Sequence, residues 1–286
     1  MANITAAMVK ELRERTSVGM MDCKKALEEC EGDMEKAIDW LRQKGLSKAA
    51  KKAGRATSEG LIAQKIAPDN SVIAFAEVMC ETDFVSRGEK FQAFAADVAA
   101  VVFDKNPADQ DALNALLGDA VANQIATLGE NMSVGRFARF QAEAPGLVGS
   151  YVHSNGKIGV MVELGCKKPA TLAKPGLLEL ARNLAMQVAA TGTAALDPAS
   201  LDPDLVERER AVFRQKTLDE GKPANIVDKI VDGRIQKFYQ EVCLMEQVYI
   251  RDDKVTIKAL VKDQGKVLDD DIAVRRFVRL QLGESS

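Results

Sequence analysis

Residues 59 to 80 read EGLIAQKIAPDNSVIAFAEVMC, and this stretch decides the fold because its apolar pattern changes from helical to extended spacing. Residues 60 to 66 and residues 71 to 80 are both rich in residue types that favour strands. Pro68, Asp69 and Asn70 lie between the two runs, and these residue types form turns. The stretch therefore predicts a β-hairpin.

The residues that follow the hairpin predict helices and one more strand. Ser86 and Glu89 have the S-x-x-E spacing of a capping box, which predicts a helix reaching about Phe103. We expect a second helix from Pro107 to about Leu128, followed by a strand over residues 133 to 142. The order strand, strand, helices, strand predicts one α+β subdomain over residues 56–143.

The same order of elements recurs over residues 144–286. Residues 149 to 153 and 157 to 166 flank a Ser-Asn-Gly turn and predict a second hairpin. Residues 177 to 190 predict a helix, and residues 275 to 282 supply the closing strand far downstream. We therefore expect a core of two related α+β subdomains with antiparallel sheets.

A pair of helices is inserted into the second subdomain at about residues 204–242. Its arms, residues 204 to 220 and 224 to 242, are joined by Gly-Lys-Pro, which is typical of a helical hairpin. The second arm carries two adjacent apolar stripes, one of Ile226, Ile230 and Phe238 and one of Val227, Val231, Ile235 and Tyr239. Because one neighbouring helix covers less than this width, the excess surface either mediates self-association or packs on the protein's own core.

The first 55 residues predict a small domain of three helices and a basic linker. Ile4, Met8 and Leu12 recur at helical spacing, and residues 17 to 19 break the pattern before Asp22 opens a second helix. The third helix is expected to begin at its N-cap Asp33 and to end at Gly45. The linker KAAKKAGR, residues 48 to 55, is either a solvated and partly helical connector or an RNA contact.

The composition indicates a cytoplasmic binding protein rather than an enzyme. The 286 residues carry a net charge of −3 and show neither a signal segment nor an apolar run of the roughly 18 residues that cross a membrane. The five cysteines form no C-x-x-C pair, and His153 is the only histidine, so metal sites and nucleophile–base pairs lack members. No phosphate-binding glycine fingerprint is present. We expect no cofactor and no metal, and any nucleotide to be held by a partner.

Several segments resemble one known family. The opening segments TAAMVKELRERT, residues 5 to 16, and GMMDCKKAL, residues 19 to 27, are similar to the start of bacterial elongation factor Ts. Further similar segments follow in the family's order: T-D-F-V at 82–85, G-S-Y-V-H at 149–153, I-G-V at 158–160, G-K-P at 221–223 and V-x-G-R at 231–234. The chain thus resembles the elongation factor Ts family over about residues 2 to 282.

The resemblance implies a ubiquitin-associated-like N-terminal domain, two related subdomains and a protruding coiled-coil hairpin. It also implies that the chain promotes GDP release from the GTPase elongation factor Tu by binding its nucleotide-free state and disturbing the magnesium and phosphate site. A homodimer or a two-plus-two complex through the hairpin is a further expectation, without membrane or direct nucleic-acid partners. Some relatives continue into another helical module, whose contacts we expect this chain to lack or to supply differently.

The resemblance also implies which residues contact elongation factor Tu. Thr82, Asp83, Phe84 and Val85 form an exchange wedge, in which Phe84 inserts between partner helices and Asp83 fixes it by hydrogen bonding. The other implied contacts are Arg13, Met20, Met21, Lys24, Leu128, Gly129, His153 and Ile250.

Each implied contact has an ordinary structural alternative. Phe84 packs over its own hairpin in that case, while Asp83 caps the following helix. Met20 and Met21 then belong to the core of the three helices, and His153 is a structural hydrogen-bonding group beside a turn. For the whole chain, one alternative is an RNA-binding translation factor, whose affinity falls steeply with salt, and another is a ubiquitin-associated-type adaptor.

Overall fold

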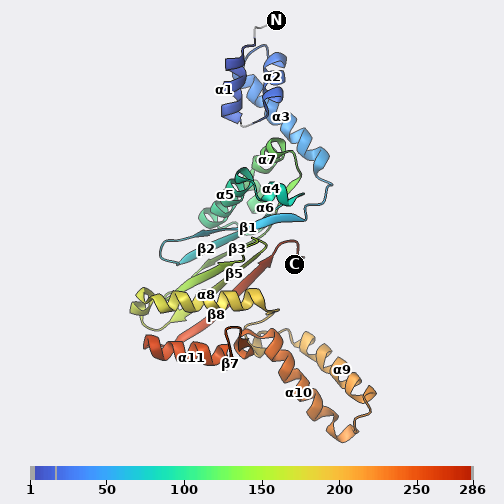
Figure 1. The fold of residues 1–286 in the computed structure, drawn as a ribbon, viewed down its shortest axis with the longest axis vertical. Coiled ribbons are helices and arrows are strands. Elements are labelled where there is room, and N and C mark those ends of the chain that lie inside the picture. The colour runs from blue at the N-terminus through green and yellow to red at the C-terminus, as the bar shows by residue number, and fades with distance from the viewer. Residues whose placement is uncertain (1–3, 17, 285–286) are drawn as a thin grey trace.

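The computed structural model describes residues 4–16 and 18–284 and shows an α+β chain (Figure 1). Helices come first along the chain, and antiparallel sheets with helices packed on them follow. The N-terminal helices lie at one end of the molecule, two three-stranded sheets lie in the middle, and two long helices extend from the other end (Figure 1). Within the described residues, no helix combines the length and the apolar character that a membrane crossing needs.

The first sheet has the strand order β1-β2-β3, with antiparallel neighbours. Its strands are β1 (Glu59–Ile66), β2 (Val72–Cys80) and β3 (Met132–Gln141). The predicted hairpin of β1 and β2 is confirmed, and Asn70 in its turn has the positive φ of 57° that asparagine tolerates. The outer face is covered by α5 (Glu89–Lys105), α6 (Gln110–Leu117) and α7 (Ala120–Leu128).

The second sheet repeats this arrangement with the order β4-β5-β8. Its strands are β4 (Gly146–Val152), β5 (Ile158–Cys166) and β8 (Ile272–Gln281). The predicted second hairpin and the distant closing strand are thereby confirmed. The outer face is covered by α8 (Pro175–Ala190), which matches the expected helix, and by α11 (Ile257–Leu268).

The inner faces of the two sheets pack on each other. Their shared apolar cluster comprises Ile62, Ile73, Phe75, Phe140, Val148, Met161 and Leu280. Gly159 permits the close approach, because a Cβ atom there would lie 2.8 Å from Ile62 and 2.9 Å from Phe75. The Ile62 amide also donates to the Gly156 carbonyl at 2.8 Å. The centre of the molecule is therefore a sandwich of helices, sheet, sheet and helices.

Each sheet buries one glutamate at the irregular position of its middle strand. Glu77 of β2 lies where the register with β3 shifts, and Glu163 of β5 lies where the register with β8 shifts. Arg136 donates from Nε to Glu77 at 3.3 Å, and Arg276 donates from Nε to Glu163 at 2.6 Å. In both sheets, an arginine of the closing strand thus neutralises the buried acid of the middle strand.

The closing strands and the helix ends before them also have similar sequences. Residues 128 to 141 read LGENMSVGRFARFQ, and residues 268 to 281 read LDDDIAVRRFVRLQ. The helix ends at a residue with positive φ in both segments, Gly129 at 83° and Asp269 at 50°. An acidic residue, Glu130 or Asp270, comes next. The halves therefore share strand order, buried acid and the geometry of this turn.

The N-terminal helices are α1 (Ala6–Thr16), α2 (Met20–Glu29) and α3 (Met34–Lys52). Asp33 is confirmed as the N-cap of α3, since its carboxylate accepts from the Lys36 amide at 3.0 Å. The break before α2 includes Val18 and Gly19, while Ser17 lies outside the described residues. The expected start of α2 at Asp22 is wrong by two residues, because Gly19 takes the N-cap position.

The expected end of the third helix at Gly45 is also wrong. Helix α3 continues to Lys52 and includes most of the basic linker. At Gly45 the helix passes close to α7, where a Cβ atom would lie 3.3 Å from the Ala126 Cβ. The glycine therefore serves close packing of two helices, and the Arg42 guanidinium adds an ion pair with Asp119.

The chain between β2 and β3 differs from the prediction in two places. Ser86 and Glu89 form no capping box, because Thr82 caps the one-turn helix α4 (Asp83–Ser86) and Gly88 occupies the N-cap position of α5. The Ser86 side chain is buried and donates to the Asp83 carbonyl at 3.0 Å. The expected single helix up to Leu128 is divided, since α6 ends at Leu117, Gly118 is its C-cap and α7 follows.

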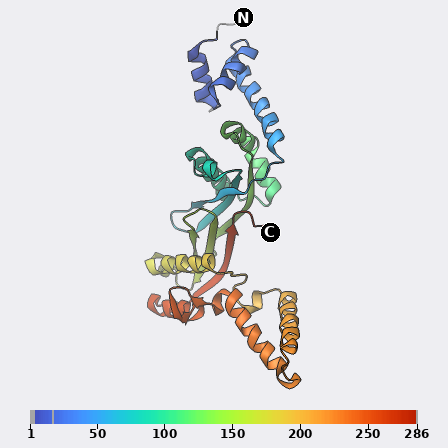
Figure 2. The ribbon, with the colours of Figure 1, turned by 45° about the vertical axis from the view of Figure 1, so that its right-hand side comes forward.

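The inserted helical hairpin is confirmed as α9 (Pro203–Asp219) and α10 (Ala224–Val242), and it projects away from the sheets (Figure 2). The stripe of Val227, Val231 and Ile235 is buried and packs with Phe213 of α9. In the other stripe, Phe238 packs at the base of the hairpin, whereas Ile226 stays exposed near the tip.

Several small elements were not predicted. They are the paired strands β6 (Val248–Tyr249) and β7 (Asp252–Thr256), the helix α11, and three 3₁₀ turns, η1 (Pro169–Ala173), η2 (Pro198–Ser200) and η3 (Leu244–Glu246).

The carboxylate of Glu163 makes the fold sensitive to acid. Burial acts to raise the pKa of this carboxyl, but the Glu143 amide and the Arg276 and Arg275 guanidinium groups lower the pKa below its ordinary value of 4.5. A group whose pKa is lower in the folded state stabilises the fold above its unfolded pKa. This stabilisation is lost as the pH falls from about 4.5 through the folded pKa.

We expect Glu163→Ala to lower the free energy of unfolding by about 3 kcal/mol at pH 7, because it leaves Arg275 and Arg276 without their buried carboxylate partner. The deficit relative to wild type should shrink below pH 4. Urea unfolding at several pH values measures both effects. As a control, Glu284→Ala removes a more exposed partner of Arg279 and should cost less than about 1 kcal/mol. Equal effects of the two substitutions contradict the assigned role of Glu163.

Candidate functional site

The sequence T-D-F-V forms an exposed turn at the end of β2. Thr82 is the N-cap of α4, where its Oγ1 accepts from the Val85 amide at 3.4 Å. Phe84 projects from this turn with 86% of its surface exposed. Val85 instead points inward and packs against the core of the first sheet. The alternative that Phe84 packs over its own hairpin is therefore wrong.

The base of the turn is fixed by buried groups. The Cys80 thiol donates to the Thr82 carbonyl at 3.2 Å, and burial raises the pKa of this thiol to about 11, so it stays protonated. Asp83 forms an exposed ion pair with Arg87 at 3.0 Å. Because Thr82 supplies the cap, the alternative that Asp83 caps the helix is wrong, and its carboxylate lies on the surface.

The turn between α7 and β3 lies beside this exposed aromatic turn. Glu130 accepts from the Thr82 amide at 3.0 Å and from the Thr82 hydroxyl at 2.7 Å. Leu128 is half-buried against the core, and Gly129 is exposed. Leu128 and Gly129, two of the expected contact residues, therefore directly precede the residue that holds the Phe84 turn.

A polar cavity of about 530 Å³ separates α4 from the turn between β4 and β5. Asp83, Arg87 and Lys157 are among the residues that line it. His153 is the first residue after β4 and is exposed, with Nδ1 3.0 Å from the Tyr151 hydroxyl. The arrangement places His153 at the start of a turn that faces the base of the Phe84 turn.

The expected contacts on the N-terminal helices form a separate surface. Met21 is 78% exposed and Met20 is 52% exposed, so the alternative that this pair is core is wrong. The buried residues of α2 are instead Cys23, Ala26 and Leu27. Arg13 and Lys24 are also exposed. These helices lie beyond α7, at the N-terminal end of the molecule (Figure 1).

Ile250 lies far from the other expected contacts. It is 48% exposed in the turn between β6 and β7, where its amide donates to the Gln187 Oε1 at 2.9 Å. The short strands lie near the base of the helical hairpin, whereas α4 lies on the other side of the two sheets (Figure 1). A partner that contacts Ile250 and Phe84 together must span the sandwich.

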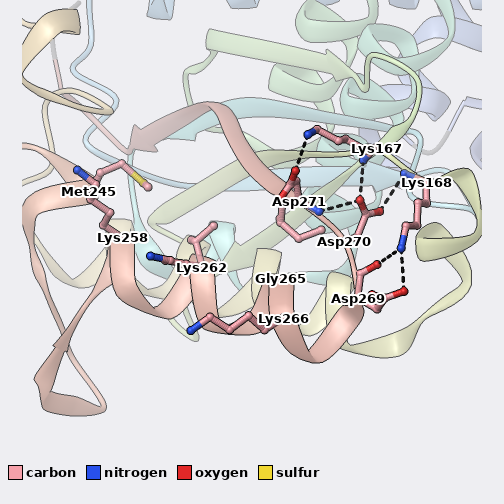
Figure 3. Close-up of a pocket in the computed structure, with 12 residues that line it drawn as sticks. Lys167, Lys168, Met245, Lys258, Lys262, Gly265, Lys266, Asp269, Asp270 and Asp271 are labelled. Carbon is pink, nitrogen blue, oxygen red and sulfur yellow. Dashed lines mark hydrogen bonds and ion pairs between the residues drawn. The ribbon is translucent and has the colours of Figure 1, made fainter.

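Across residues 4–16 and 18–284, no group of three or more His, Cys, Asp or Glu side chains is placed to hold a metal ion. A second cavity, of about 830 Å³, lies beside α11 (Figure 3). Two of its three aspartates form ion pairs, Asp269 with Lys168 at 2.7 Å and Asp271 with Lys167, and the third, Asp270, accepts hydrogen bonds from the Lys167 and Lys168 amides.

Sequence reasoning missed Glu130 as a component of this site. The signal was available, because residues 128 to 141 resemble residues 268 to 281 and each segment has an acidic residue after the end of its helix. Near this turn, the resemblance to the family indicated Leu128 and Gly129 as contact residues but not Glu130.

A family model described as "Elongation factor TS" matches residues 81–284, which is most of the chain. The chain belongs to the elongation factor Ts family. The elongation factor Ts of Desulfovibrio desulfuricans is 61% identical over 283 residues, with 99% of each chain covered. That of Nitratidesulfovibrio vulgaris is 56% identical, over 99% of this chain and 97% of the relative. Elongation factor Ts of Symbiobacterium thermophilum is 45% identical, over 99% of this chain and 93% of the relative.

The exposure of Phe84 predicts a small effect on stability. We expect Phe84→Ala to change the free energy of unfolding by less than about 0.5 kcal/mol, since the ring has little contact with its own core. Phe91→Ala is the matched control, because this fully buried ring of α5 should cost about 3 to 5 kcal/mol. Urea unfolding of both variants decides the point, and a large loss in Phe84→Ala contradicts the projecting geometry.

Proposed function

We propose that this chain promotes GDP release from elongation factor Tu and that the turn of residues 82–85 is the part that acts on the nucleotide site. The elongation factor Ts family is the nucleotide exchange factor of elongation factor Tu, and its members are not enzymes. They act in translation in the bacterial cytoplasm, in agreement with the expectation from the sequence. The observation that carries the residue assignment is the exposed ring of Phe84 on a fixed base.

Exchange needs no chemistry from this chain. A GTPase holds its nucleotide through backbone groups around the phosphates and through a magnesium ion. A factor that binds the nucleotide-free state better than the nucleotide-bound state shifts the equilibrium by that difference in affinity. Weakening nucleotide binding 10⁴-fold takes about 5.5 kcal/mol of such coupling, and the nucleotide then weakens factor binding equally. That reciprocity lets the factor dissociate after exchange.

Phe84 is suited to supply part of this coupling. Burying a phenylalanine side chain in a partner gains about 1.5 to 3 kcal/mol, and the ring pays little in lost contacts with its own protein. Its insertion between partner helices displaces the groups that hold magnesium and phosphate. Asp83 lies beside it on the surface, where it can accept hydrogen bonds from the partner.

The other contacts divide into docking and nearby supporting groups. Arg13, Met20, Met21 and Lys24 form a docking surface on the N-terminal helices, where exposed methionines adapt to a partner. Leu128, Gly129 and His153 extend the surface around Phe84, and Ile250 adds a contact on the far side of the sheets.

The domain organisation follows from the same proposal. Residues 1–55 are a ubiquitin-associated-like domain with its linker, residues 56–143 are the first core subdomain, and residues 144–286 are the second. The shared strand order and buried acids support a common origin of the two subdomains. The helical hairpin, inserted at about residues 204–242, is a coiled coil.

The RNA-binding alternative loses support at the basic linker. Lys48 pairs with Asp22 at 2.9 Å, Arg55 pairs with Glu81 at 3.4 Å, and Lys52 donates to the Gly129 carbonyl. These three cations are engaged within the protein. A solvated and mostly helical connector is the better interpretation of residues 48–55.

Release of fluorescent GDP from elongation factor Tu tests the exchange function and the wedge together. Wild type should accelerate release, and Phe84→Ala should lose most of the acceleration while remaining folded. Asp83→Ala should act in the same direction, and the double variant should lose less than the sum of the two, because both residues serve one insertion. Val267→Ala removes another exposed apolar side chain, on α11, and should leave exchange unchanged. Near-normal exchange by folded Phe84→Ala contradicts the wedge.

We also propose that the hairpin mediates self-association, through a homodimer or a two-plus-two complex. Its exposed apolar side chains, Val212 in the middle of α9 and Leu218 and Ile226 near the tip, support this role. Replacing residues 204–242 with a short linker should leave a folded core with lower self-association or weaker binding to elongation factor Tu. Light scattering and binding measurements decide, and unchanged mass together with unchanged binding contradicts the proposal.

A further inference from the structure

Residues 129 to 131 hold together three parts of the molecule that are distant in sequence. They form the turn between α7 and β3. On one side they contact the Phe84 turn, and on the other side they contact the end of α3 and the linker. The C-terminal end of α3 and the turn that carries Phe84 are therefore fastened to the same short segment.

Glu130 fixes the wedge through its carboxylate. One oxygen accepts from the Thr82 amide at 3.0 Å, and the other accepts from the Thr82 hydroxyl at 2.7 Å. Because the hydroxyl proton points to Glu130, a lone pair of Oγ1 remains for the Val85 amide at the start of α4. Glu130 thus sets the orientation of the cap, and the cap sets the orientation of the turn that carries Phe84.

The linker is attached by the next residue. The Asn131 side chain donates from Nδ2 to the Arg55 carbonyl at 2.7 Å, and the backbone N–H of Asn131 donates to the Glu81 carboxylate at 2.6 Å. The Asn131 amide is the main cause that lowers the pKa of the Glu81 carboxyl, which stays ionised. Lys52, the last residue of α3, donates to the Gly129 carbonyl.

We call the grip of the Glu130 carboxylate on the residues after β2 a clamp. In the second half of the chain, Asp270 forms an equivalent clamp on the residues after β5, without an aromatic residue to present (Figure 3). Asp270 accepts from the amides of Lys167 and Lys168 at 3.1 and 2.9 Å and from the Thr171 hydroxyl at 2.6 Å. These groups follow β5 as Thr82 follows β2. The clamp is therefore a feature of this fold, and only the first half combines it with an exposed phenylalanine.

We propose that Glu130 is a positioning residue for nucleotide exchange, which acts by holding the Thr82 cap so that Phe84 is presented in one orientation. This inference rests on the proposed exchange function and on the wedge role of Phe84. Glu130 itself is half-buried behind the turn. Its loss should therefore lower the rate of GDP release within the complex more than the affinity of docking, which depends on α1 and α2.

The test measures GDP release from elongation factor Tu over a range of factor concentrations. Glu130→Ala should lower the maximal rate about tenfold, as expected for two lost hydrogen bonds to a carboxylate, with less than a threefold change in the half-saturating concentration. Glu130→Gln keeps one acceptor oxygen and should recover part of the maximal rate. A raised half-saturating concentration at an unchanged maximal rate overturns the proposal.

Asp270→Ala is the matched control, because it removes the equivalent clamp in the second half. It should reduce the melting temperature about as much as Glu130→Ala and leave exchange unchanged. If both variants lose exchange in parallel with stability, the role of Glu130 is only structural and the proposal fails.

A double variant shows whether Glu130 acts through Phe84. In the background of the partial variant Phe84→Leu, Glu130→Ala should lower the maximal rate of GDP release by a smaller factor than it does in wild type. If the two fold-losses in rate instead multiply, Glu130 acts independently of Phe84 and the proposal is overturned. Wild type and Phe84→Ala test the exchange function and the wedge role separately. Absence of acceleration by wild type rejects the exchange function, and normal exchange by Phe84→Ala rejects the wedge. Normal exchange by Glu130→Ala beside an impaired Phe84→Ala rejects only the role of Glu130.

Discussion

The packing of Phe75 and its neighbours between the two sheets is the constraint on which the molecule depends. The inner face of each three-stranded sheet is apolar, and the other sheet covers it and removes it from water. Gly159 lets the two backbones approach, and the outer helices close the sandwich. Because β2 is buried on both faces, the position at which it ends is fixed, and the turn that follows begins from a rigid base.

That rigidity gives an exposed aromatic ring its use. A projecting phenylalanine on a flexible loop would lose conformational freedom on binding, whereas the Thr82 cap, the Cys80 thiol and the Glu130 carboxylate have already ordered this turn. The exposed ring contributes little to its own fold and keeps its apolar surface for a partner. In the function proposed above, the surfaces on α1, α2 and the hairpin supply affinity, and the turn discriminates between the nucleotide-free and nucleotide-bound states of elongation factor Tu.

The sequence predicted elements whose signals are local and missed those that depend on tertiary contacts. A few residues predict the turn at Asn70 and the Gly-Lys-Pro junction. The β-hairpin of β1 and β2 and the helical hairpin of α9 and α10 are both as expected. Gly45 looked like a helix end, but its lack of a side chain serves packing on Ala126. The S-x-x-E spacing at Ser86 forms no capping box, because Ser86 lies inside the one-turn helix α4 and its side chain is buried. For the site, the family resemblance supplied Phe84, whereas the hydrogen bonds of Glu130 became visible only in the fold.

The proposed exchange requires this chain to bind nucleotide-free elongation factor Tu more tightly than the GDP-bound form. A closed thermodynamic cycle measures this difference directly. The measurement is the affinity of this chain for elongation factor Tu without nucleotide and with GDP, alongside the affinity of elongation factor Tu for GDP with and without this chain. We expect the chain to bind the nucleotide-free form more tightly, by the same factor by which it weakens GDP binding. Equal affinities for the two forms would contradict it.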